Sequence, residues 1–350
     1  ERPWQHCGHR PRQRADAMDF DALMLRAIDA SRAAQGFSSP NPPVGAVIVA
    51  PDGTVVGVGA TQPPGGPHAE VMALRQAGES ARGATAVVTL EPCNHTGRTG
   101  PCAHALLAAG IAEVAYAVAD PNPTAAGGAQ TLRAAGVTVH GGIGSTDAEA
   151  GPLKPWLFRQ RHGRPMVTAK IASTIDGRIA APDGTSQWIT GTDARAHAHE
   201  TRARIDAIVV GTGTALRDNP TLTARRPGGQ PYAHQPARVV VGKRDLPGDA
   251  ALRTEPGYVH VHSHDPADVL AALPDALWVL VEGGPSIIGA FADADLVDDI
   301  DHYLAPALLG AGASSVGANQ VTTLADKRVF RREEITELGD DLYVRYRRQR

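Results

Sequence analysis

The stretch that decides the fold runs from residue 68 to residue 102 and reads HAEVMALRQAGESARGATAVVTLEPCNHTGRTGPC. Its first nine residues have the apolar spacing of a helix, and the apolar, β-branched run at 84–90 predicts a buried strand. A second helix is expected over 102–109, ended by Gly110. The stretch therefore predicts a helix–strand–helix unit in which His68 and Cys102 both stand at the start of a helix.

The same alternation continues on either side of this unit. Before it, a helix is expected from Asp19, followed by antiparallel strands at 44–50 and 54–59 joined through Asp52-Gly53. After it, strands are expected at 111–118 and 137–140 around a helix at 130–135. Strands that alternate with helices of this length are typical of an α/β fold, with a largely parallel sheet covered on both faces.

The chain is long enough for two domains. Its 350 residues compare with about 150 per domain, and the periodicity lapses around 151–163. The α/β pattern then resumes, with strands expected at 166–173, 207–211, 238–241, 258–262, 278–282 and 300–304 and helices at 193–204 and 285–292. We therefore expect a loose N-terminal extension at 1–15, one domain at 16–157 and a second at 158–350.

Composition narrows the possible partners. The formal net charge is −3 and the body of the chain has no basic block, so a nucleic-acid partner is not expected. Apolar runs fall far short of the roughly 18 residues that span a bilayer, so no membrane partner is expected. Three cysteines and no secretory pattern predict a reducing, cytoplasmic setting.

The most informative residues are His68, Cys93 and Cys102. One imidazole and two thiolates are three ligands for a tetrahedral zinc ion, with the fourth position left for water, as in catalytic sites. Glu70 would stand beside the metal without binding it and shuttle a proton, as the corresponding glutamate does in zinc deaminases. Any one of these residues alone is more often an ordinary core or surface residue. Their order along the chain, each at a strand-to-helix junction, favours the zinc site.

The loop between the two cysteines is unusually long for such a site. Nucleobase deaminases have two residues there, whereas this chain has eight. The loop carries His95 and Arg98, and the planar guanidinium of an arginine suits a substrate phosphate.

The second half offers weaker motifs. Residues 211–214 (GTGT) follow an expected strand and form half of a dinucleotide fingerprint. Residues 282–286 (EGGPS) place two glycines and a proline at a strand-to-helix turn, where the helix amino terminus would face a phosphate. An ordinary turn remains the alternative for both. His260, His262 and His264 alternate along one face of an expected strand, and we interpret them, with His197 and His199, as structural.

Together these motifs resemble the bifunctional deaminase/reductase family of riboflavin biosynthesis, over nearly everything after Met18. The segments that resemble the deaminase half are residues 41–45 (NPPVG), 68–70 (HAE), 89–95 (TLEPCNH), 97–99 (GRT), Cys102 and 120–123 (DPNP). Those that resemble the reductase half are residues 170–178 (KIASTIDGR), 186–190 (SQWIT), 218–225 (DNPTLTAR) and 281–285 (VEGGP).

The resemblance implies a fold and two reactions. The first domain would be a cytidine-deaminase-like α/β/α sandwich that uses zinc to remove the 2-amino group of 2,5-diamino-6-(5-phosphoribosylamino)pyrimidin-4(3H)-one as ammonia. The second would be a dihydrofolate-reductase-like α/β domain. It would use NADPH to reduce the ribosyl group to ribityl, giving 5-amino-6-(5-phosphoribitylamino)uracil. A homodimer or homotetramer is also implied.

The resemblance also implies roles for individual residues. The deaminase substrate would be contacted by Asn41, His95, Arg98, Asp120 and Asn122. The nucleotide would be contacted by Ala172, Trp188, Thr214, Asp218, Gly284, Pro285, Ser286, Ile287, Ile288, Gly289 and Ala290. The phosphorylated substrate of the reductase would be held by Lys170, Ser186, Arg202, Leu222, Arg225 and Glu282. The chain departs from the family at Thr61, where a histidine is frequent, and at Gly100-Pro101, where a Pro-Pro pair is frequent.

Two other functions stay open on the sequence. One is a nucleoside or transfer-RNA deaminase with an unrelated appendage, although the near-neutral charge and the long cysteine spacing argue against it. The other is a non-catalytic binding protein in which zinc only holds a loop. A structural zinc normally has four protein ligands, and the sequence supplies three.

Overall fold

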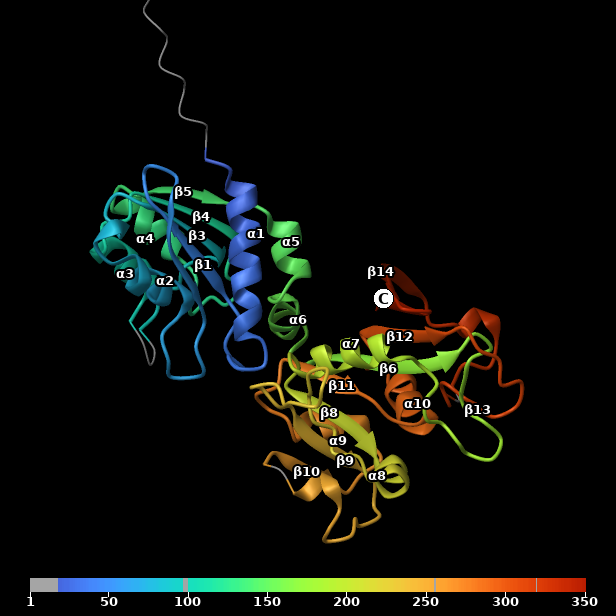
Figure 1. Cartoon of the computed structure of the whole chain (residues 1–350). Helices are drawn as coiled ribbons and strands as arrows, with labels where there is room; N and C mark the ends of the chain where they lie inside the picture. Colours follow the sequence, from blue (N-terminus) through green and yellow to red (C-terminus); the bar gives the residue numbers. More distant parts are fainter. Residues whose placement is uncertain (1–17, 97–99, 255, 319) are drawn as a thin grey trace, which may run out of the picture.

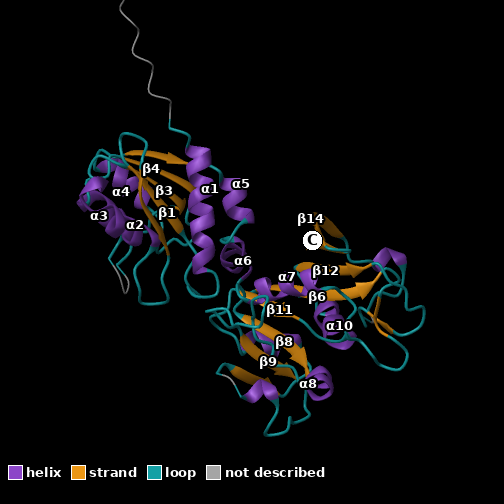
Figure 2. Cartoon of the chain, viewed as in Figure 1, coloured by secondary structure: helices purple, strands orange, loops and turns teal. Residues whose placement is uncertain are grey.

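The computed structural model describes residues 18–96, 100–254, 256–318 and 320–350. The expected N-terminal extension at 1–15, with Cys7, lies outside the described residues, and so does Arg98. The described residues form two α/β units, each built on its own sheet (Figures 1 and 2). Within them no helix has the length and apolar character needed to cross a membrane.

The sheet of the first unit is largely parallel, as the sequence predicted, with one strand that runs against the others. Its strands lie in the order β2-β1-β3-β4-β5, and β1 alone among these five runs antiparallel to its neighbours. The strands are β1 (Gly45–Val49), β2 (Val55–Ala60), β3 (Thr85–Leu90), β4 (Glu113–Val118) and β5 (Thr138–Gly141). This strand belongs to the predicted β1–β2 hairpin, which enters the sheet through β1, so β1 pairs antiparallel with β3 as well.

Helices cover both faces of this sheet. On one face lie α2 (Ala69–Ala77), α3 (Cys102–Ala108) and α4 (Gly128–Ala134), and on the other lie α1 (Phe20–Ser31) and α5 (Ser145–Ala150) (Figure 1). Glycines on β2 let α2 approach the sheet closely: a Cβ at Gly59 would lie 2.3 Å from the Ala69 carbonyl oxygen, and one at Gly57 would lie 2.2 Å from that of Ala73. This packing fixes the start of α2, where His68 stands.

The region expected to lack periodicity, 151–163, contains a helix, α6 (Lys154–His162). Two of its buried side chains, those of Trp156 and Leu157, belong to the core of the first unit. Arg159 donates hydrogen bonds to the carbonyl oxygens of Pro274 and Ala276 in the second unit. The sequence did not predict α6 because this short helix has no repeating apolar face. Contacts with the rest of the fold stabilise it instead.

The second unit follows the predicted α/β order. Its main sheet has the strand order β10-β9-β8-β11-β6-β12-β15-β14, parallel from β10 to β12 and antiparallel beyond. The strands are β6 (Met166–Thr174), β8 (Ala207–Gly211), β9 (Ala237–Val241), β10 (Tyr258–Val261), β11 (Trp278–Val281), β12 (Asp299–Ala305), β14 (Phe330–Leu338) and β15 (Asp341–Arg348). A small ladder joins β7 (Arg178–Ala180) to β13 (Ala313–Ser314).

The helices of this unit are α7 (Thr192–Arg202), α8 (Thr212–Asp218), α9 (Pro266–Ala271) and α10 (Pro285–Asp293). Several elements were not predicted, namely α8, α9, the β7–β13 ladder and the C-terminal β14–β15 hairpin. β14 is an exposed edge strand with many charged residues, a composition that protects an edge but hides the strand from pattern analysis. The parallel strands β8, β9, β10 and β11 all end at one edge of the sheet, and the residues considered below gather there and around β6.

Candidate active sites

Three side chains with metal-binding atoms meet where α2, α3 and the loop after β3 converge. His68 directly precedes α2 and Cys102 is the first residue of α3. The Nδ1 atom of His68 lies 3.2 Å from Sγ of Cys102 and 3.6 Å from Sγ of Cys93. The backbone N–H of Cys102 donates to Cys93 Sγ at 3.4 Å. The structure thus brings together the three residues that the sequence predicted as zinc ligands.

The geometry of this group fits a zinc ion. The three donor atoms lie within 4.8 Å of one another. In a tetrahedral site with Zn–N and Zn–S bonds of about 2.1 and 2.3 Å, a nitrogen and a sulfur ligand are ~3.6 Å apart. Both nitrogen–sulfur separations are close to that value. Three protein donors leave the fourth position for water or substrate, which is the arrangement of a catalytic zinc site.

The thiol of Cys93 loses its proton more easily than an ordinary cysteine thiol. A hydrogen bond from the Cys102 thiol lowers the pKa of Cys93 to about 4, and interactions with His68 and the Cys102 backbone add to this against the opposing effect of burial. The same thiol–thiol hydrogen bond, together with burial, raises the pKa of Cys102. One of the two sulfurs is therefore ready to bind a cation.

Glu70 lies in the first turn of α2, beside this group. Its side chain is buried, and only 4% of the residue is exposed. Burial raises the pKa of Glu70 to about 7, and the negative charge of Cys93 contributes to the rise. A carboxyl group with a pKa near neutrality can both accept and return a proton, as a general acid–base requires.

Glu91 is a buried residue of this site to which the sequence assigned no role. Its Oε1 accepts hydrogen bonds from the backbone of Gly127 (3.2 Å) and Ala129 (3.1 Å), and its Oε2 accepts one from Asp120 (3.2 Å). The carboxylate ties the loop after β4 and the start of α4 to the chain just before Cys93. Its place in the quoted motif, two residues before Cys93, was the signal that could have identified it.

Of the residues expected to contact the deaminase substrate, some lie near Cys93, and for others the structure shows only their backbone surroundings. Asp120 lies near Cys93 and His95: burial raises its pKa, the charge of Cys93 adds to the rise, and His95 opposes it. The Nδ1 atom of His95 is buried and has no hydrogen-bond partner among the described residues. Asn122 follows Asp120 in an Asx turn, its backbone N–H donating to Asp120 Oδ1 at 2.8 Å. Asn41 lies in the turn before β1.

Thr61, the departure from the family pattern, has a structural contact. Its Oγ1 accepts a hydrogen bond from the backbone N–H of Val44 at 3.1 Å, and the residue is buried. The threonine therefore holds the chain that enters β1, directly after residues 41–43.

A second cluster lies in the other unit, on β6, α7 and the end of β11. Glu282 accepts hydrogen bonds from Arg202 Nε (3.0 Å) and Nη2 (2.7 Å) and from Lys170 Nζ (3.1 Å). Burial alone would raise the pKa of Glu282, but the Arg202 and Lys170 charges outweigh it and hold that pKa far below its usual range. The structure brings together three of the residues expected to hold the phosphorylated substrate.

Arg225 approaches this cluster through His199, a residue that we interpreted as structural. The backbone N–H of Arg225 donates to His199 Nδ1 at 3.2 Å. Burial lowers the pKa of His199 to about 4, helped by the positive charges of Arg202 and Arg225. Leu222 is different: its side chain is buried in a core cluster and its φ is +54°. Any contact of Leu222 with a ligand is therefore made by its backbone.

The two glycine-containing turns lie side by side. β8 and β11 are adjacent and parallel, so α8 and α10 begin at neighbouring points on the same edge of the sheet. A Cβ at Gly284 would lie 3.9 Å from Thr214 Oγ1, so these two turns are in contact. Pro285 and Ser286 form the first turn of α10, while Asp218 is exposed at the far end of α8.

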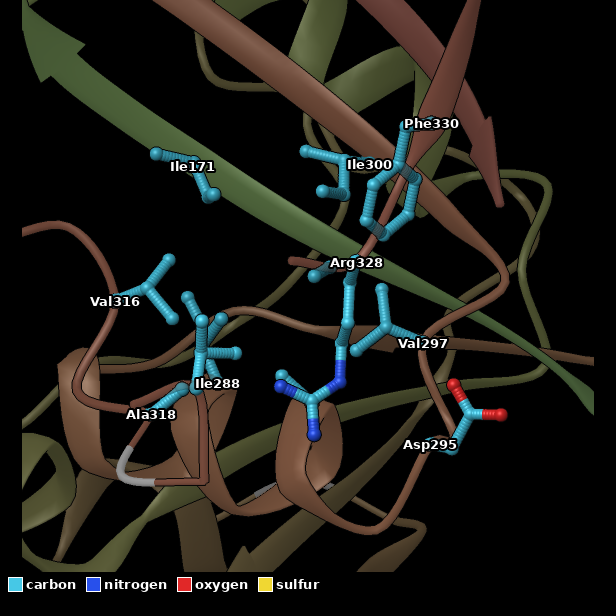
Figure 3. Close-up of a pocket in the computed structure, with 12 residues that line it drawn as sticks. Ile171, Ile288, Asp295, Val297, Ile300, Val316, Ala318, Arg328 and Phe330 are labelled. Carbon is cyan, nitrogen blue, oxygen red and sulfur yellow. The ribbon is translucent and has the colours of Figure 1, made fainter. Parts of the chain in front are cut away.

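The other expected nucleotide contacts, residues 287–290, lie further along α10. Ile288 is buried and faces an apolar cavity of about 190 Å³, whose other walls include Ile171, Ile300 and Phe330 (Figure 3). A Cβ at Gly289 would lie only 2.4 Å from the carbonyl oxygen of Gly317, so this glycine allows close packing. Ile287 packs against the same core, and Ala290 is partly buried. Ile288 and Gly289 therefore pack against the interior of the unit, while the Ile287 side chain also lies beside the Gly283 turn.

The remaining candidates lie beyond the end of β6 and on that strand. Trp188 is 70% exposed, and the guanidinium carbon of Arg195 lies 4.7 Å from the centre of its ring. Ser186 is partly buried in the same loop. Ala172 lies on β6 and packs against a cluster that contains Tyr303. Trp188 thus presents an exposed aromatic ring, whereas Ala172 is a packed residue of β6.

The fold and the two sites define a class of protein, a zinc deaminase joined to a reductase. Residues 18–118 match the family model of the cytidine and deoxycytidylate deaminase zinc-binding region, and residues 165–344 match that of the RibD C-terminal domain. The chain belongs to the RibD family, the bifunctional deaminase/reductases of riboflavin biosynthesis. The resemblance seen in the sequence is thereby confirmed, as are the cytidine-deaminase-like first domain and the dihydrofolate-reductase-like second domain.

Individual members of this family are similar in sequence over almost the whole chain. The riboflavin biosynthesis protein RibD of Mycobacterium tuberculosis (strain ATCC 25618 / H37Rv) is 49% identical over 93% of this chain and 96% of its own length. That of Escherichia coli (strain K12) is 37% identical over 93% of this chain and 98% of its own length. Since the second half is a RibD domain, the alternative of a deaminase with an unrelated appendage is wrong, and so is that of a non-catalytic binding protein.

Solved structures support the same family assignment. That of Acinetobacter baumannii RibD (form 1) superimposes with a TM-score of 0.85 at 34% identity, over 95% of this chain and 99% of its own. The deaminase/reductase of Thermotoga maritima superimposes with a TM-score of 0.82 at 30% identity, over 94% of this chain and 99% of its own. The similarity therefore includes both units together.

Proposed function

We propose that the chain carries out two successive reactions on one small phosphorylated substrate, the first in residues 16–157 and the second in residues 158–350. The first removes the 2-amino group of 2,5-diamino-6-(5-phosphoribosylamino)pyrimidin-4(3H)-one, and the second reduces the ribosyl group with NADPH to give 5-amino-6-(5-phosphoribitylamino)uracil. The Thermotoga maritima relative is named for a deaminase and a reductase of this kind. The proposed boundary falls within α6, which contacts both units.

In the deaminase half, His68, Cys93 and Cys102 would hold the zinc ion. When bound, zinc supplies a Lewis acid that makes a nearby water more acidic. Glu70 would take one proton from this water and deliver it to the ring nitrogen as the hydroxide adds to the ring carbon. It would then pass the proton of the resulting hydroxyl to the amine, which leaves as ammonia while the carbonyl forms. A pKa of about 7 suits both transfers, because the group neither holds nor releases the proton too strongly near neutrality.

The deaminase substrate would be held by side chains around this group. His95 has an unpartnered buried nitrogen, and Asp120 lies nearby, so these two residues are placed to recognise the base or ribose. We assign the same task to Asn41 and Asn122, and the phosphate to Arg98. Glu91 acts through Asp120, whose backbone it holds, and is a positioning residue.

In the reductase half, the neighbouring turns at Gly211 and Gly284 would bind the nucleotide. Its other contacts on α8 and α10 would be Thr214, Asp218, Pro285 and Ser286. When bound, NADPH supplies the hydride. The amino terminus of α10 favours a phosphate, because the first N–H groups of a helix have no partner within it and the cap residue, Gly284, has no side chain to cover them. Ala172 and the open face of Trp188 would contact the nucleotide elsewhere, and residues 287–290 would contribute backbone or packing.

The reductase substrate would lie against the Lys170–Glu282–Arg202 cluster, with Arg225 at its exposed side. Two of the three charges in the cluster are positive, and Arg225 adds a third, so the cluster region favours a phosphorylated ligand. Glu282 fixes the guanidinium of Arg202 in one orientation by accepting two of its hydrogen bonds. Ser186 and the backbone of Leu222 would complete this site.

The observation that carries the proposal is the presence of two separate groups, His68/Cys93/Cys102 with Glu70 in one unit and Lys170/Arg202/Glu282 in the other. A coupled assay on zinc-loaded protein tests it. Ammonia is expected to appear from the diaminopyrimidine substrate without NADPH, and NADPH is expected to be consumed only after deamination. Consumption of NADPH by the undeaminated substrate at the full rate would contradict the proposed order.

We propose that the enzyme acts as a homodimer or homotetramer in the cytoplasm, with no nucleic-acid or membrane partner. The expected result is a single species of two or four chains in light scattering coupled to size-exclusion chromatography. A monomer that is fully active in the coupled assay would contradict the proposed assembly.

A further inference from the structure

Apart from the zinc ligands, a second group of potential metal ligands is found among the described residues: Asp245, His260 and His262. We propose that these three side chains form a binding site for a divalent transition-metal ion such as Zn²⁺ or Ni²⁺, separate from the deaminase zinc. The site would lie in the reductase unit, at the end of β9 and β10. It is independent of the function proposed above.

The two histidines stand on the same face of β10 and its extension. Side chains two residues apart on a strand point to the same side, as the sequence pattern indicated. The rings of His260 and His262 stack, with their centres 3.8 Å apart and an angle of 25° between their planes. They do not belong to the hydrophobic core, because His260 is only partly buried and His262 is exposed. Their position at the surface therefore allows a further role besides the structural one that we expected from the sequence.

Asp245 is brought to the histidines by the chain that leaves β9. β9 and β10 are parallel and end in register at Val241 and Val261, and the backbone N–H of Gly242 donates to the Val261 carbonyl oxygen at 3.1 Å. Leu246, the residue after Asp245, is buried in the core. Asp245 is thus on a short loop held at both ends, and its carboxylate lies within 4.8 Å of a ring nitrogen of each histidine.

A further contact prepares His260 as a ligand. Its Nε2 lies 2.9 Å from the carbonyl oxygen of Gly242. Since a carbonyl only accepts, Nε2 carries the proton, and in the neutral ring the lone pair is on Nδ1. A metal-bound histidine usually donates a hydrogen bond from its other ring nitrogen to a backbone carbonyl or a carboxylate. The contact between His260 and Gly242 is of this kind.

The donor set selects the class of metal. Two imidazole nitrogens and one carboxylate oxygen suit Zn²⁺, Ni²⁺, Co²⁺ or Cu²⁺, whereas Mg²⁺ and Ca²⁺ prefer six or more oxygen ligands. Around a tetrahedral ion with bonds of about 2.1 Å, ligand atoms are ~3.4 Å apart. Donor atoms within 4.8 Å reach this spacing by rotation of the exposed Asp245 and His262 side chains. A bound ion would tie the 242–245 loop to the end of β10.

The test is a metal titration of the full chain without a histidine tag, already holding one zinc per chain. Isothermal titration with Zn²⁺ is expected to show one further equivalent, and titration with Mg²⁺ none. His260→Ala and His262→Ala should each weaken this second binding at least about tenfold. His264→Ala is the matched control, since His264 is exposed in the same segment but lies outside the group, and it should bind like the unchanged protein.

A thermal melt gives a second readout that does not depend on activity. Added Zn²⁺ should raise the melting temperature of the unchanged protein and of His264→Ala, and leave that of His262→Ala unchanged. The proposal is overturned if the unchanged protein takes up no second equivalent. It is equally overturned if the double variant His260→Ala/His262→Ala binds as tightly as the unchanged protein, or if His264→Ala loses as much affinity as His262→Ala. Circular dichroism of each variant establishes that it is folded.

Discussion

Arg202 and Glu282 form a two-point ion pair, with Arg202 Nε and Nη2 at 3.0 and 2.7 Å from the two carboxylate oxygens. The pair joins the end of α7 to the end of β11, and Lys170 reaches the same carboxylate from β6. Three elements that are far apart in the sequence therefore meet at one carboxylate. Its loss should affect both the reductase site and the stability of the unit.

Glu282→Gln tests this relationship. The variant leaves Lys170 and Arg202 without a counter-charge in a site where their side chains are only 18% and 13% exposed. We expect the free energy of unfolding to fall by about 2 kcal/mol and the reductase rate to fall, with ammonia release unchanged. Urea unfolding and the two separate assays measure this. Arg204→Gln, at an exposed ion pair just after the same helix, is the control and should change neither.

The contribution of Glu282 should depend on pH in a defined direction. Its pKa in the folded protein lies well below the value of 4.5 for the free side chain, so the unfolded chain takes up the proton first as the pH falls. The stabilisation is therefore fully present at neutral pH and is lost as the pH falls below about 4.5. The difference in unfolding free energy between the unchanged protein and Glu282→Gln should be constant from pH 6 to 8 and shrink in acid. A difference that grew in acid would contradict the ion-pair assignment.

Glu70→Gln should separate metal binding from proton transfer. The amide keeps the shape of the side chain but cannot accept the proton, so ammonia release should fall by a factor of about 10² to 10⁴. Zinc content, measured by atomic absorption, should remain at one per chain, and reduction of the deaminated intermediate should continue. Glu79→Gln, on the exposed turn after α2, is the control. Normal deamination by Glu70→Gln would show that another group moves the proton.

Removal of the metal should affect only one of the two activities. Treatment with a zinc chelator, or Cys102→Ser, should abolish ammonia release while NADPH oxidation with the deaminated intermediate persists. The reason is that the three ligands all lie in the first unit, at the starts of α2 and α3 and in the loop after β3. Loss of both activities in a folded, zinc-free protein would mean that the two units are not independent.

Glu91 should behave as a positioning residue. Glu91→Ala removes the acceptor of three backbone N–H groups, so we expect a loss of about 3 kcal/mol in unfolding free energy and a marked fall in deamination. Glu91→Gln retains one acceptor oxygen and should recover part of the activity. If the role were purely structural, the surviving deamination of Glu91→Gln would show an unchanged KM. A raised KM is expected, because Asp120 is held by this carboxylate.

The sequence by itself identified the candidate residues for the chemistry of the first site. The proposed zinc ligands and the glutamate proposed to transfer the proton are close in the chain, at 68–70, 93 and 102. Their positions at the starts of helices and after a strand can be recognised from neighbouring residues alone. The alternation of helices and strands likewise determined the α/β class and the existence of two units. These features are readable because hydrophobic periodicity and metal-ligand chemistry depend on nearby residues.

Only the tertiary structure decided the arrangements that depend on distant residues. The antiparallel place of β1, the helix α6 and the β14–β15 hairpin each follow from contacts made across the fold, which local periodicity does not encode. The same holds for Glu91, whose three donors come from residues 120–129, and for Ile288, which faces the interior. Asp245 and the histidines at 260 and 262 are brought together because β9 and β10 are parallel and end in register, a relationship that no local pattern contains.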